Sequence, residues 1–135
     1  METIALPNDI KVFYTTAKSF PDGIVEAYDK LHVLVPPSSG RKYYGISRPE
    51  NGTIVYKAAV EEITPGEAEK FGLNTLVLKK GNYICTILND WMKDTTEIGS
   101  VFSELLTQPG LDPEGYCVEY YFNDKDVRCM VRLDD

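Results

Sequence analysis

The sequence feature that most constrains the fold is one order of elements that the residue pattern predicts twice. Apolar periodicity predicts a strand, a helix and two further strands, in that order. The first set of elements occupies residues 10–14, 22–34, 43–47 and 53–61. The second set occupies residues 83–88, 96–106, 116–122 and 127–133. A repeated strand-helix-strand-strand order indicates an internal duplication at the level of structure.

The helices of the two sets have the clearest signals. In the second helix Asp94 and Glu97 fit a capping box, with Asp94 in place of the usual Ser or Thr. Five apolar residues then recur at helical spacing and predict one buried stripe: Ile98, Val101, Phe102, Leu105 and Leu106. The Pro-, Ser- and Gly-rich residues 36–40 are expected to end the first helix.

The expected fold is therefore one α+β domain over residues 1–135, with half-units at about 10–62 and 74–133. The predicted joint between the halves is an acidic connector of residues 63–73, which also contains Pro65, Gly66 and Gly72. Two main helices should pack on one antiparallel sheet about a pseudo-twofold axis. We expect a small-molecule pocket at the crease between the halves, because pockets are common where similar units meet.

Composition excludes several classes of function. The net charge of −7 argues against a nucleic-acid partner, because phosphate contacts need clustered Lys and Arg. No apolar run reaches the length of about 18 residues that a membrane span needs, and the first ten residues do not form a secretory signal. The three cysteines have no metal-site or redox spacing, so we expect reduced thiols in a cytoplasmic protein. No motif for a metal or cofactor is present in the sequence.

A single carboxylate, Glu119, lies among tyrosines in the strand predicted for residues 116–122. If Phe122 pairs with Val127 across the terminal hairpin, Glu119 faces Met130, with Arg128 and Arg132 as diagonal neighbours. That register favours an exposed carboxylate in a surface charge cluster. The alternative is that the other half of the domain covers this face, so that Glu119 meets a positive or hydrogen-bonding ligand.

Aromatic residues support the second alternative. Nine of the residues are tyrosines, and several lie on predicted strands that face one another. Aromatic faces around one carboxylate suit a flat or cationic organic ligand, by stacking, cation–π attraction and charge pairing. The candidate ligand-binding residues are Tyr44, Tyr83, Trp91, Glu119 and Tyr121.

Five short motifs, in this order, resemble the GyrI-like small-molecule-binding domain. They are Phe20-Pro21-Asp22-Gly23-Ile24, Tyr44-Gly45-Ile46-Ser47, Gly81-Asn82-Tyr83, Val101-Phe102-Ser103-Glu104-Leu105 and Val118-Glu119-Tyr120-Tyr121. The resemblance covers about residues 10–133. This family supplies effector-binding domains of AraC- and MerR-type multidrug-responsive regulators and also occurs as stand-alone proteins.

The resemblance implies a stand-alone domain that binds a lipophilic or cationic aromatic compound, with Glu119 as its counter-charge. The enzyme alternative is a hydrolase of strained cyclopropane-bearing electrophiles, in which Glu119 and Tyr121 would be the catalytic residues. A third alternative is the sensory half of a split regulator, which would act through a separate regulator protein. We expect a monomer or a weak homodimer.

Overall fold

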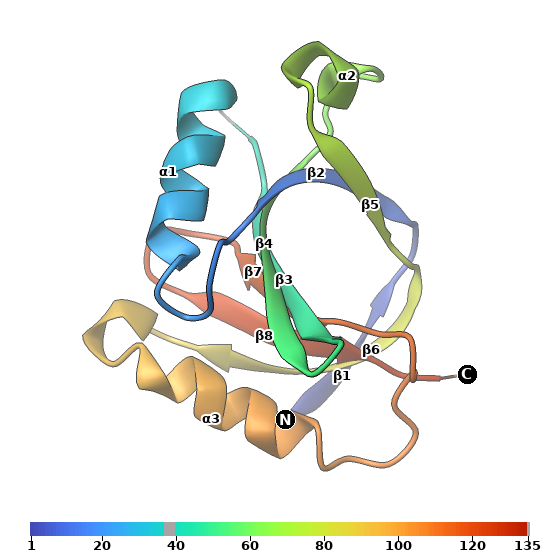
Figure 1. Ribbon diagram of the computed structural model, residues 1–135. Coiled ribbons are helices and arrows are strands. Elements are labelled where there is room, and N and C mark those ends of the chain that lie inside the picture. The colour runs from blue at the N-terminus through green and yellow to red at the C-terminus, as the bar shows by residue number, and fades with distance from the viewer. Residues whose placement is uncertain (37–39, 135) are drawn as a thin grey trace.

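The computed structural model describes residues 1–36 and 40–134 (Figure 1). Its helices are α1 (Ile24–Leu34), α2 (Glu67–Phe71) and α3 (Thr96–Leu105), with a 3₁₀ turn at Trp91–Lys93. Its strands are β1 (Glu2–Leu6), β2 (Ile10–Thr16), β3 (Tyr43–Glu50), β4 (Thr53–Glu61), β5 (Asn74–Leu78), β6 (Gly81–Leu88), β7 (Cys117–Tyr121) and β8 (Val127–Arg132). The predicted α+β class is confirmed. Residues 37–39, predicted to help end the first helix, lie outside the described residues.

All eight strands belong to one antiparallel sheet, in the order β1-β6-β8-β7-β3-β4-β2-β5. The predicted sets appear as β2-α1-β3-β4 and β6-α3-β7-β8, and they meet where β3 pairs with β7. The strand that precedes each set pairs with the other set: β1 lies beside β6, and β5 lies beside β2. The topology is therefore symmetric about the β3–β7 pair.

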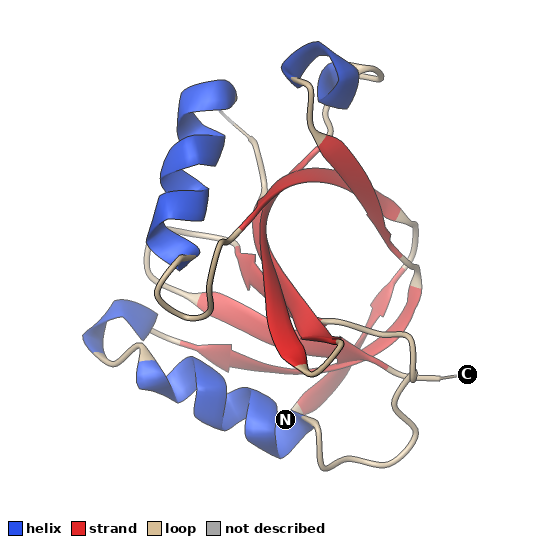
Figure 2. Ribbon diagram, in the orientation of Figure 1, coloured by secondary structure: helices blue, strands red, loops and turns tan. Residues whose placement is uncertain are grey.

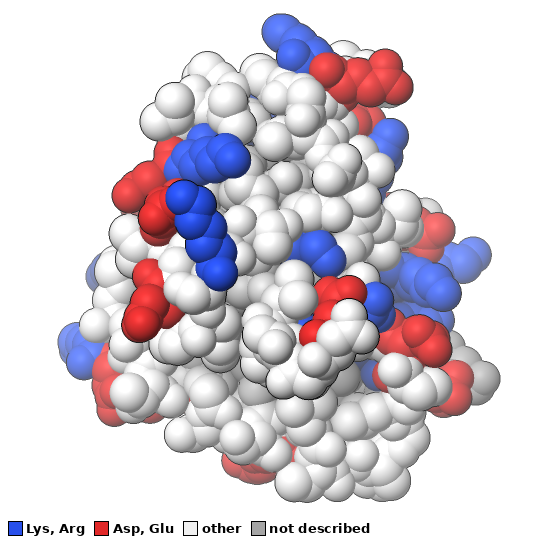
Figure 3. All heavy atoms as spheres, in the orientation of Figure 1, with Lys and Arg blue, Asp and Glu red and all other residues white. Residues whose placement is uncertain are grey.

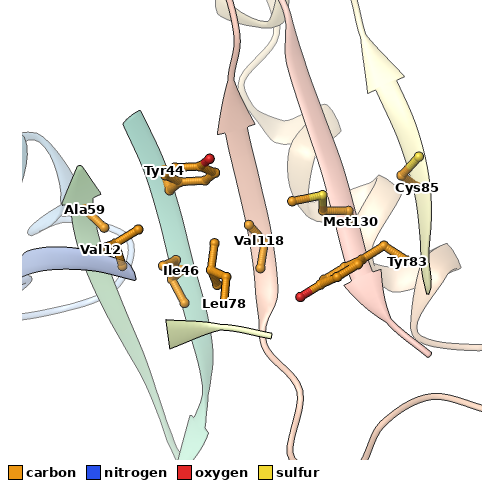
Figure 4. Close-up of a cluster of buried hydrophobic side chains, with 9 residues drawn as sticks. All are labelled: Val12, Tyr44, Ile46, Ala59, Leu78, Tyr83, Cys85, Val118 and Met130. Atoms are coloured by element: carbon orange, nitrogen blue, oxygen red, sulfur yellow. The ribbon is translucent and has the colours of Figure 1, made fainter. Parts of the chain in front are cut away.

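The sheet curls strongly, and α1 and α3 both lie on its outer face, over different strands (Figure 2). The inner face carries its own buried cluster, which includes Val12, Tyr44, Ile46, Tyr83 and Val118 (Figure 4). On the outer face, α1 buries Leu31 against β2 and β4, and α3 buries Leu105 against β6 and β8. Both faces of the sheet are thus covered over much of their area, which explains why several strands have apolar residues at consecutive positions.

Two elements were not predicted from the sequence. Strand β1 contains the alternating Ile4 and Leu6, whose side chains pack against the inner cluster. Helix α2 has five residues and lies within the predicted acidic joint. Gly66 and Gly72 flank it with φ angles of 91° and 68°, a left-handed backbone that favours glycine. A helix this short lacks the repeated apolar spacing on which sequence prediction depends.

The register of the terminal hairpin differs from the predicted one by a single residue. Glu119 pairs with Cys129, and Met130 pairs with Val118. A shift of one residue moves every side chain of a strand to the opposite face. Of the two alternatives for Glu119, the exposed carboxylate beside Arg128 and Arg132 is therefore excluded. The carboxylate lies instead on the outer face, beside residues that α3 covers.

The asparagine at the start of the hairpin loop explains the shift. The Asn123 side-chain oxygen accepts hydrogen bonds from the backbone N–H groups of Lys125 and Asp126, both at 2.8 Å. The Asn123 side chain also donates to Asp126 at 3.0 Å. This local network lies in a loop of residues 122–126, one residue longer than the loop of residues 123–126 that the predicted Phe122–Val127 pairing leaves, and loop length sets the register of a hairpin.

Within the described residues, neither the surface charges seen in Figure 3 nor the cysteine thiols mark a functional site. Acidic and basic side chains are scattered over the face seen in Figure 3 and form no basic patch there. Within residues 1–36 and 40–134, no helix has the length and apolar character needed to cross a bilayer. Cys85, Cys117 and Cys129 are free thiols, and burial raises the pKa of Cys117 to about 11 and that of Cys129 to about 12. Such thiols are poor nucleophiles at neutral pH.

Candidate functional site

The candidate site lies where the two halves of the domain meet. Strands β3 and β7 pair over five residue pairs, and the central pair is Gly45 with Glu119. Helix α1 covers the strands on one side of this pair and α3 covers those on the other side (Figure 1). Glu119 therefore lies on the outer face of the sheet, in the crease between the two helices. This is the crease that the duplicated order predicted.

Glu119 is buried, with 7% of its surface exposed, and its contacts are phenols. Its Oε1 atom contacts the hydroxyls of Tyr56, at 3.1 Å, and Tyr121. The Tyr56 hydroxyl lies 3.0 Å from that of Tyr28, which in turn lies 2.9 Å from the backbone oxygen of Tyr44. The described ion pairs include none with Glu119. A buried carboxyl is thus held by hydroxyls alone.

Aromatic rings surround this carboxyl. Tyr28 makes edge contacts with Tyr56 and Tyr121, both at a centroid distance of 6.2 Å. Trp91, in the 3₁₀ turn, packs on Tyr121 at 5.2 Å, and Phe20 stacks on Tyr56 at 6.0 Å. We call these five residues the aromatic cage: Phe20, Tyr28, Tyr56, Trp91 and Tyr121. Phe20 is 46% exposed and Tyr56 only 1%, so the cage runs from the surface to the sheet.

Burial dominates the protonation of the site. It raises the pKa of the Glu119 carboxyl above its ordinary value, and the hydroxyls of Tyr121 and Tyr56 only partly oppose this shift. Burial also raises the pKa of the Tyr28, Tyr56 and Tyr121 phenols, so all three remain neutral at physiological pH. The site therefore combines one acidic proton with hydroxyl groups that both donate and accept hydrogen bonds.

A glycine makes room for this network. Gly45 lies directly across from Glu119, and a Cβ atom added there would lie 2.1 Å from the Tyr56 hydroxyl and 2.8 Å from Glu119 Oε1. Both distances are far below van der Waals contact. The Tyr44-Gly45 motif of β3 is thus explained by space, because any side chain at position 45 would occupy the place of the Tyr56–Glu119 contact.

The structure brings together three of the five residues predicted for the site. Glu119, Tyr121 and Trp91 share the crease. Tyr44 and Tyr83 do not join them, because both belong to the buried cluster of the inner face. Tyr44 stacks on Tyr120 there, at 5.1 Å. The sequence grouped these tyrosines because strands predicted to face one another carry them, but alternate residues of a strand point to opposite faces.

Three residues of the aromatic cage were missed: Phe20, Tyr28 and Tyr56. Tyr28 belongs to the apolar stripe of the first predicted helix, and Tyr56 to the apolar face of the strand that became β4. Neither was chosen for the site, although Tyr56 was one of the tyrosines on strands predicted to face one another. A signal was available, since a tyrosine within an apolar stripe needs a partner for its hydroxyl. Where two such stripes face a single carboxylate, that carboxylate is the expected hydrogen-bonding group for their tyrosine hydroxyls.

The buried carboxyl should make stability depend on pH. The folded-state pKa of Glu119 lies above the value of about 4.5 expected for an unfolded chain, so the folded state holds the proton more tightly. Its stabilising contribution is complete below pH 4.5 and is lost as pH rises through the folded pKa. We expect the free energy of unfolding to fall across this window, by at most about 1.4 kcal/mol per pH unit.

Urea unfolding of wild type and Glu119→Gln between pH 5 and about pH 9 checks this expectation. The glutamine variant should lack this part of the slope, because its amide does not titrate. Glu97→Gln, on the exposed surface of α3, should keep the wild-type slope. Identical slopes in wild type and Glu119→Gln would show that Glu119 ionises alike in both states.

Metal binding has no support in the described part of the chain. Residues 1–36 and 40–134 contain no group of three His, Cys, Asp or Glu side chains placed to hold a metal ion. The crease is therefore best described as a buried acid within an aromatic cage, at the symmetry point of a duplicated α+β domain.

Solved structures share this architecture, although no family model and no curated protein matches the chain. A Vibrio cholerae integron cassette protein superposes with a TM-score of 0.69 at 13% identity, covering 98% of this chain and 94% of its own. SAV2435 bound to tetraphenylphosphonium gives 0.68 at 13% identity, covering 97% and 93%. A Staphylococcus aureus MU50 protein assigned to transcription regulation gives 0.62 at 13% identity, covering 97% of each chain. At 13% identity these likenesses show a shared fold, and they agree with the predicted α+β architecture.

Proposed function

We propose that the protein binds a lipophilic aromatic cation in the crease, with Glu119 as the counter-charge and the aromatic cage as the wall. The observation that carries this proposal is a buried carboxyl surrounded by rings, without an ion pair among the described residues. A dry carboxylate is unfavourable unless a positive charge reaches it. A cation with an apolar surface supplies that charge and also stacks on the rings.

Tetraphenylphosphonium is a suitable probe for the proposal. It is a permanent cation with four aromatic arms, and SAV2435, which has the same fold, was solved with it bound. In this chain the cage is composed of rings that lie 5.2–6.2 Å apart, so a bulky guest needs some of them to move. Phe20, at the exposed edge, has the greatest freedom to do so.

Binding is preferred to the hydrolase alternative for a geometric reason. In a hydrolase, Glu119 would direct water while Tyr121 polarised a leaving group. In the structure the Tyr121 hydroxyl is directed at Glu119 itself, and Tyr56 contacts the same oxygen. The phenols therefore position the acid instead of facing an empty space where a substrate would lie.

Glu119→Gln should weaken tetraphenylphosphonium binding about 10- to 100-fold, because the amide keeps the shape of the carboxyl but removes its charge. Trp91 is the only tryptophan and packs on Tyr121, so its fluorescence should report binding in a titration. The control is Glu97→Gln, which removes a carboxylate from the exposed surface of α3 and should bind as wild type does.

A neutral probe of similar shape separates charge from stacking. Triphenylmethane, which is neutral and has no hydrogen-bond acceptor, should bind wild type and Glu119→Gln with similar affinity, because its recognition would depend on the rings alone. Equal affinity of both proteins for tetraphenylphosphonium would remove Glu119 from the site. The absence of any response in wild type would refute the proposed function.

A further inference from the structure

The hydrogen bonds of the crease indicate the protonation state of Glu119 in the absence of a ligand. Four contacts form one continuous chain of oxygens, which runs from the backbone oxygen of Tyr44 through Tyr28, Tyr56 and Glu119 to Tyr121. The Tyr44–Tyr28, Tyr28–Tyr56 and Tyr56–Glu119 contacts measure 2.9, 3.0 and 3.1 Å. Each contact needs one hydrogen, because two oxygens at this distance repel each other without one.

The three phenols supply only three hydrogens, one each. The Tyr28 hydroxyl donates to the Tyr44 carbonyl, which has no hydrogen of its own to give. The Tyr28–Tyr56 contact must then use the Tyr56 hydrogen, and the Tyr121 hydrogen fills the contact at the other end. The Tyr56–Glu119 contact is left without a hydrogen unless the carboxyl provides it. Tyr56 donates to Oε1 when the carboxyl is ionised; a proton on Oε1 would reverse this contact and complete the chain, with Oε1 donating to Tyr56 while accepting from Tyr121.

We propose that the empty crease holds Glu119 as a neutral carboxylic acid, and that a lipophilic cation binds by exchange with this proton, which leaves to solvent. The exchange rests on the proposed function and specifies the state of the same site. One cation enters and one proton leaves, so the charge buried in the crease does not change. The inference concerns the charge class of the ligand: cations compete with protons, and neutral aromatic compounds do not.

No described neighbour offers another way to neutralise the carboxyl. Of the bases on the surrounding elements, Lys30 is exposed, His32 packs on Tyr43 and Lys57 pairs with Glu50. The titratable groups that interact with Glu119 are the phenols of Tyr28, Tyr56 and Tyr121 and the thiols of Cys117 and Cys129. None of these groups is a base. The side chains that α3 and the 3₁₀ turn direct toward this face are apolar or aromatic. Arg132 pairs with Asp112, at 3.0 Å, and the Arg128 guanidinium lies over the Phe122 ring.

Burial acts in the same direction as the hydrogen count. It raises the pKa of Glu119 above its ordinary value, which favours the neutral acid in the empty site. Ionisation would leave two phenol oxygens 3.0 Å apart with no hydrogen between them, at the Tyr28–Tyr56 contact. Tyr28 is therefore a positioning residue: its hydroxyl acts on Glu119 through Tyr56, without touching the carboxyl.

Calorimetry measures the exchange directly. Tetraphenylphosphonium is titrated into wild type near neutral pH, in phosphate and in Tris, whose ionisation enthalpies differ. The difference in heat gives the number of protons released, which should approach about one per bound cation. Triphenylmethane should release none, and Glu119→Gln should release none with either probe. Affinity for the cation should rise as pH increases.

Tyr28→Phe provides the sharper test. Removing this hydroxyl eliminates the two contacts that use it, and leaves two contacts for the two remaining phenol hydrogens. Tyr56 is then free to donate to an ionised Glu119, so we expect ionisation at lower pH and fewer protons released near neutral pH. Tyr14→Phe, on the inner face of the sheet, is the matched control and should release as many protons as wild type.

Carbon-13 NMR of the glutamate carboxyls tests the empty site without a ligand. The resonance missing from Glu119→Gln identifies Glu119, and its titration should lie above the ordinary range of a glutamate carboxyl and move to lower pH in Tyr28→Phe. Tight cation binding without proton release would overturn the proposed exchange, as would a resonance showing that the Glu119 carboxyl is ionised throughout the neutral range. Either result would leave the proposed function intact. If wild type binds no cation, the proposed function fails, and the exchange fails with it.

Discussion

Leu105→Ala is expected to lower the free energy of unfolding by about 2–5 kcal/mol. Leu105 is fully buried at the end of α3, in a cluster with Phe102, Val127 and Cys129. The substitution would remove most of the Leu105 side chain, which α3 packs against β8, and would leave a cavity in a close-packed region. Urea unfolding, monitored by circular dichroism, gives the change directly.

The neighbouring residue provides the control. Leu106→Ala is the same substitution one position later, but Leu106 is 52% exposed and follows the last residue of the helix. We expect this variant to stay within about 0.5 kcal/mol of wild type. Similar losses in the two variants would mean that α3 does not pack on the sheet through Leu105.

Gly45→Ala should destabilise the fold by about 1–3 kcal/mol, although alanine adds a single methyl group. The added Cβ would lie 2.1 Å from the Tyr56 hydroxyl, which has no room to retreat because Tyr56 is 1% exposed. The Tyr56–Glu119 contact must break or β3 must shift. The variant should therefore lose tetraphenylphosphonium binding as well as stability, measured by thermal unfolding and Trp91 fluorescence.

Two further variants make this expectation specific. In Gly45→Ala with Tyr56→Phe, the hydroxyl that the methyl group meets is gone, so the two substitutions together should cost less than the sum of their separate effects. Gly99→Ala places the same methyl group in α3, where nothing lies within 4 Å, and should stabilise the protein by about 0.5–1 kcal/mol. Additive losses in the double variant would show that the clash lies elsewhere.

The sequence was sufficient to predict the α+β class and the crease, because both depend on the order of elements. Periodicity of 3.6 residues identified α1 and α3, and the doubled order placed β3 and β7 at the centre. It also drew attention to Glu119, because a carboxylate between apolar strand residues requires a physical explanation. These inferences use the average properties of whole segments, which single residues rarely overturn.

The inferences that failed depend on individual residues. Whether Glu119 meets arginines or phenols depends on a one-residue register, and the hydrogen bonds of Asn123 set that register. Alternation could not decide it, because both faces of β7 are covered and neither carries a polar repeat. The grouping of Tyr44 and Tyr83 with Glu119 has the same origin, since a tyrosine suits the inner cluster, where both lie, as well as the crease.

Strands β1 and β5, which precede the two sets, each pair with the other set, and this arrangement has a mechanical consequence. Clefts between two bodies usually admit a guest by rotation about a hinge. Here the halves are joined by β3 with β7, by β1 with β6 and by β5 with β2, so a rotation would strain backbone ladders at three separate places. The frame should thus stay rigid while the rings at its opening, Phe20 and Trp91, swing aside. Differences in shape among ligands would then be absorbed by a few side-chain torsion angles of these rings, while the backbone of the crease and the position of Glu119 stay unchanged.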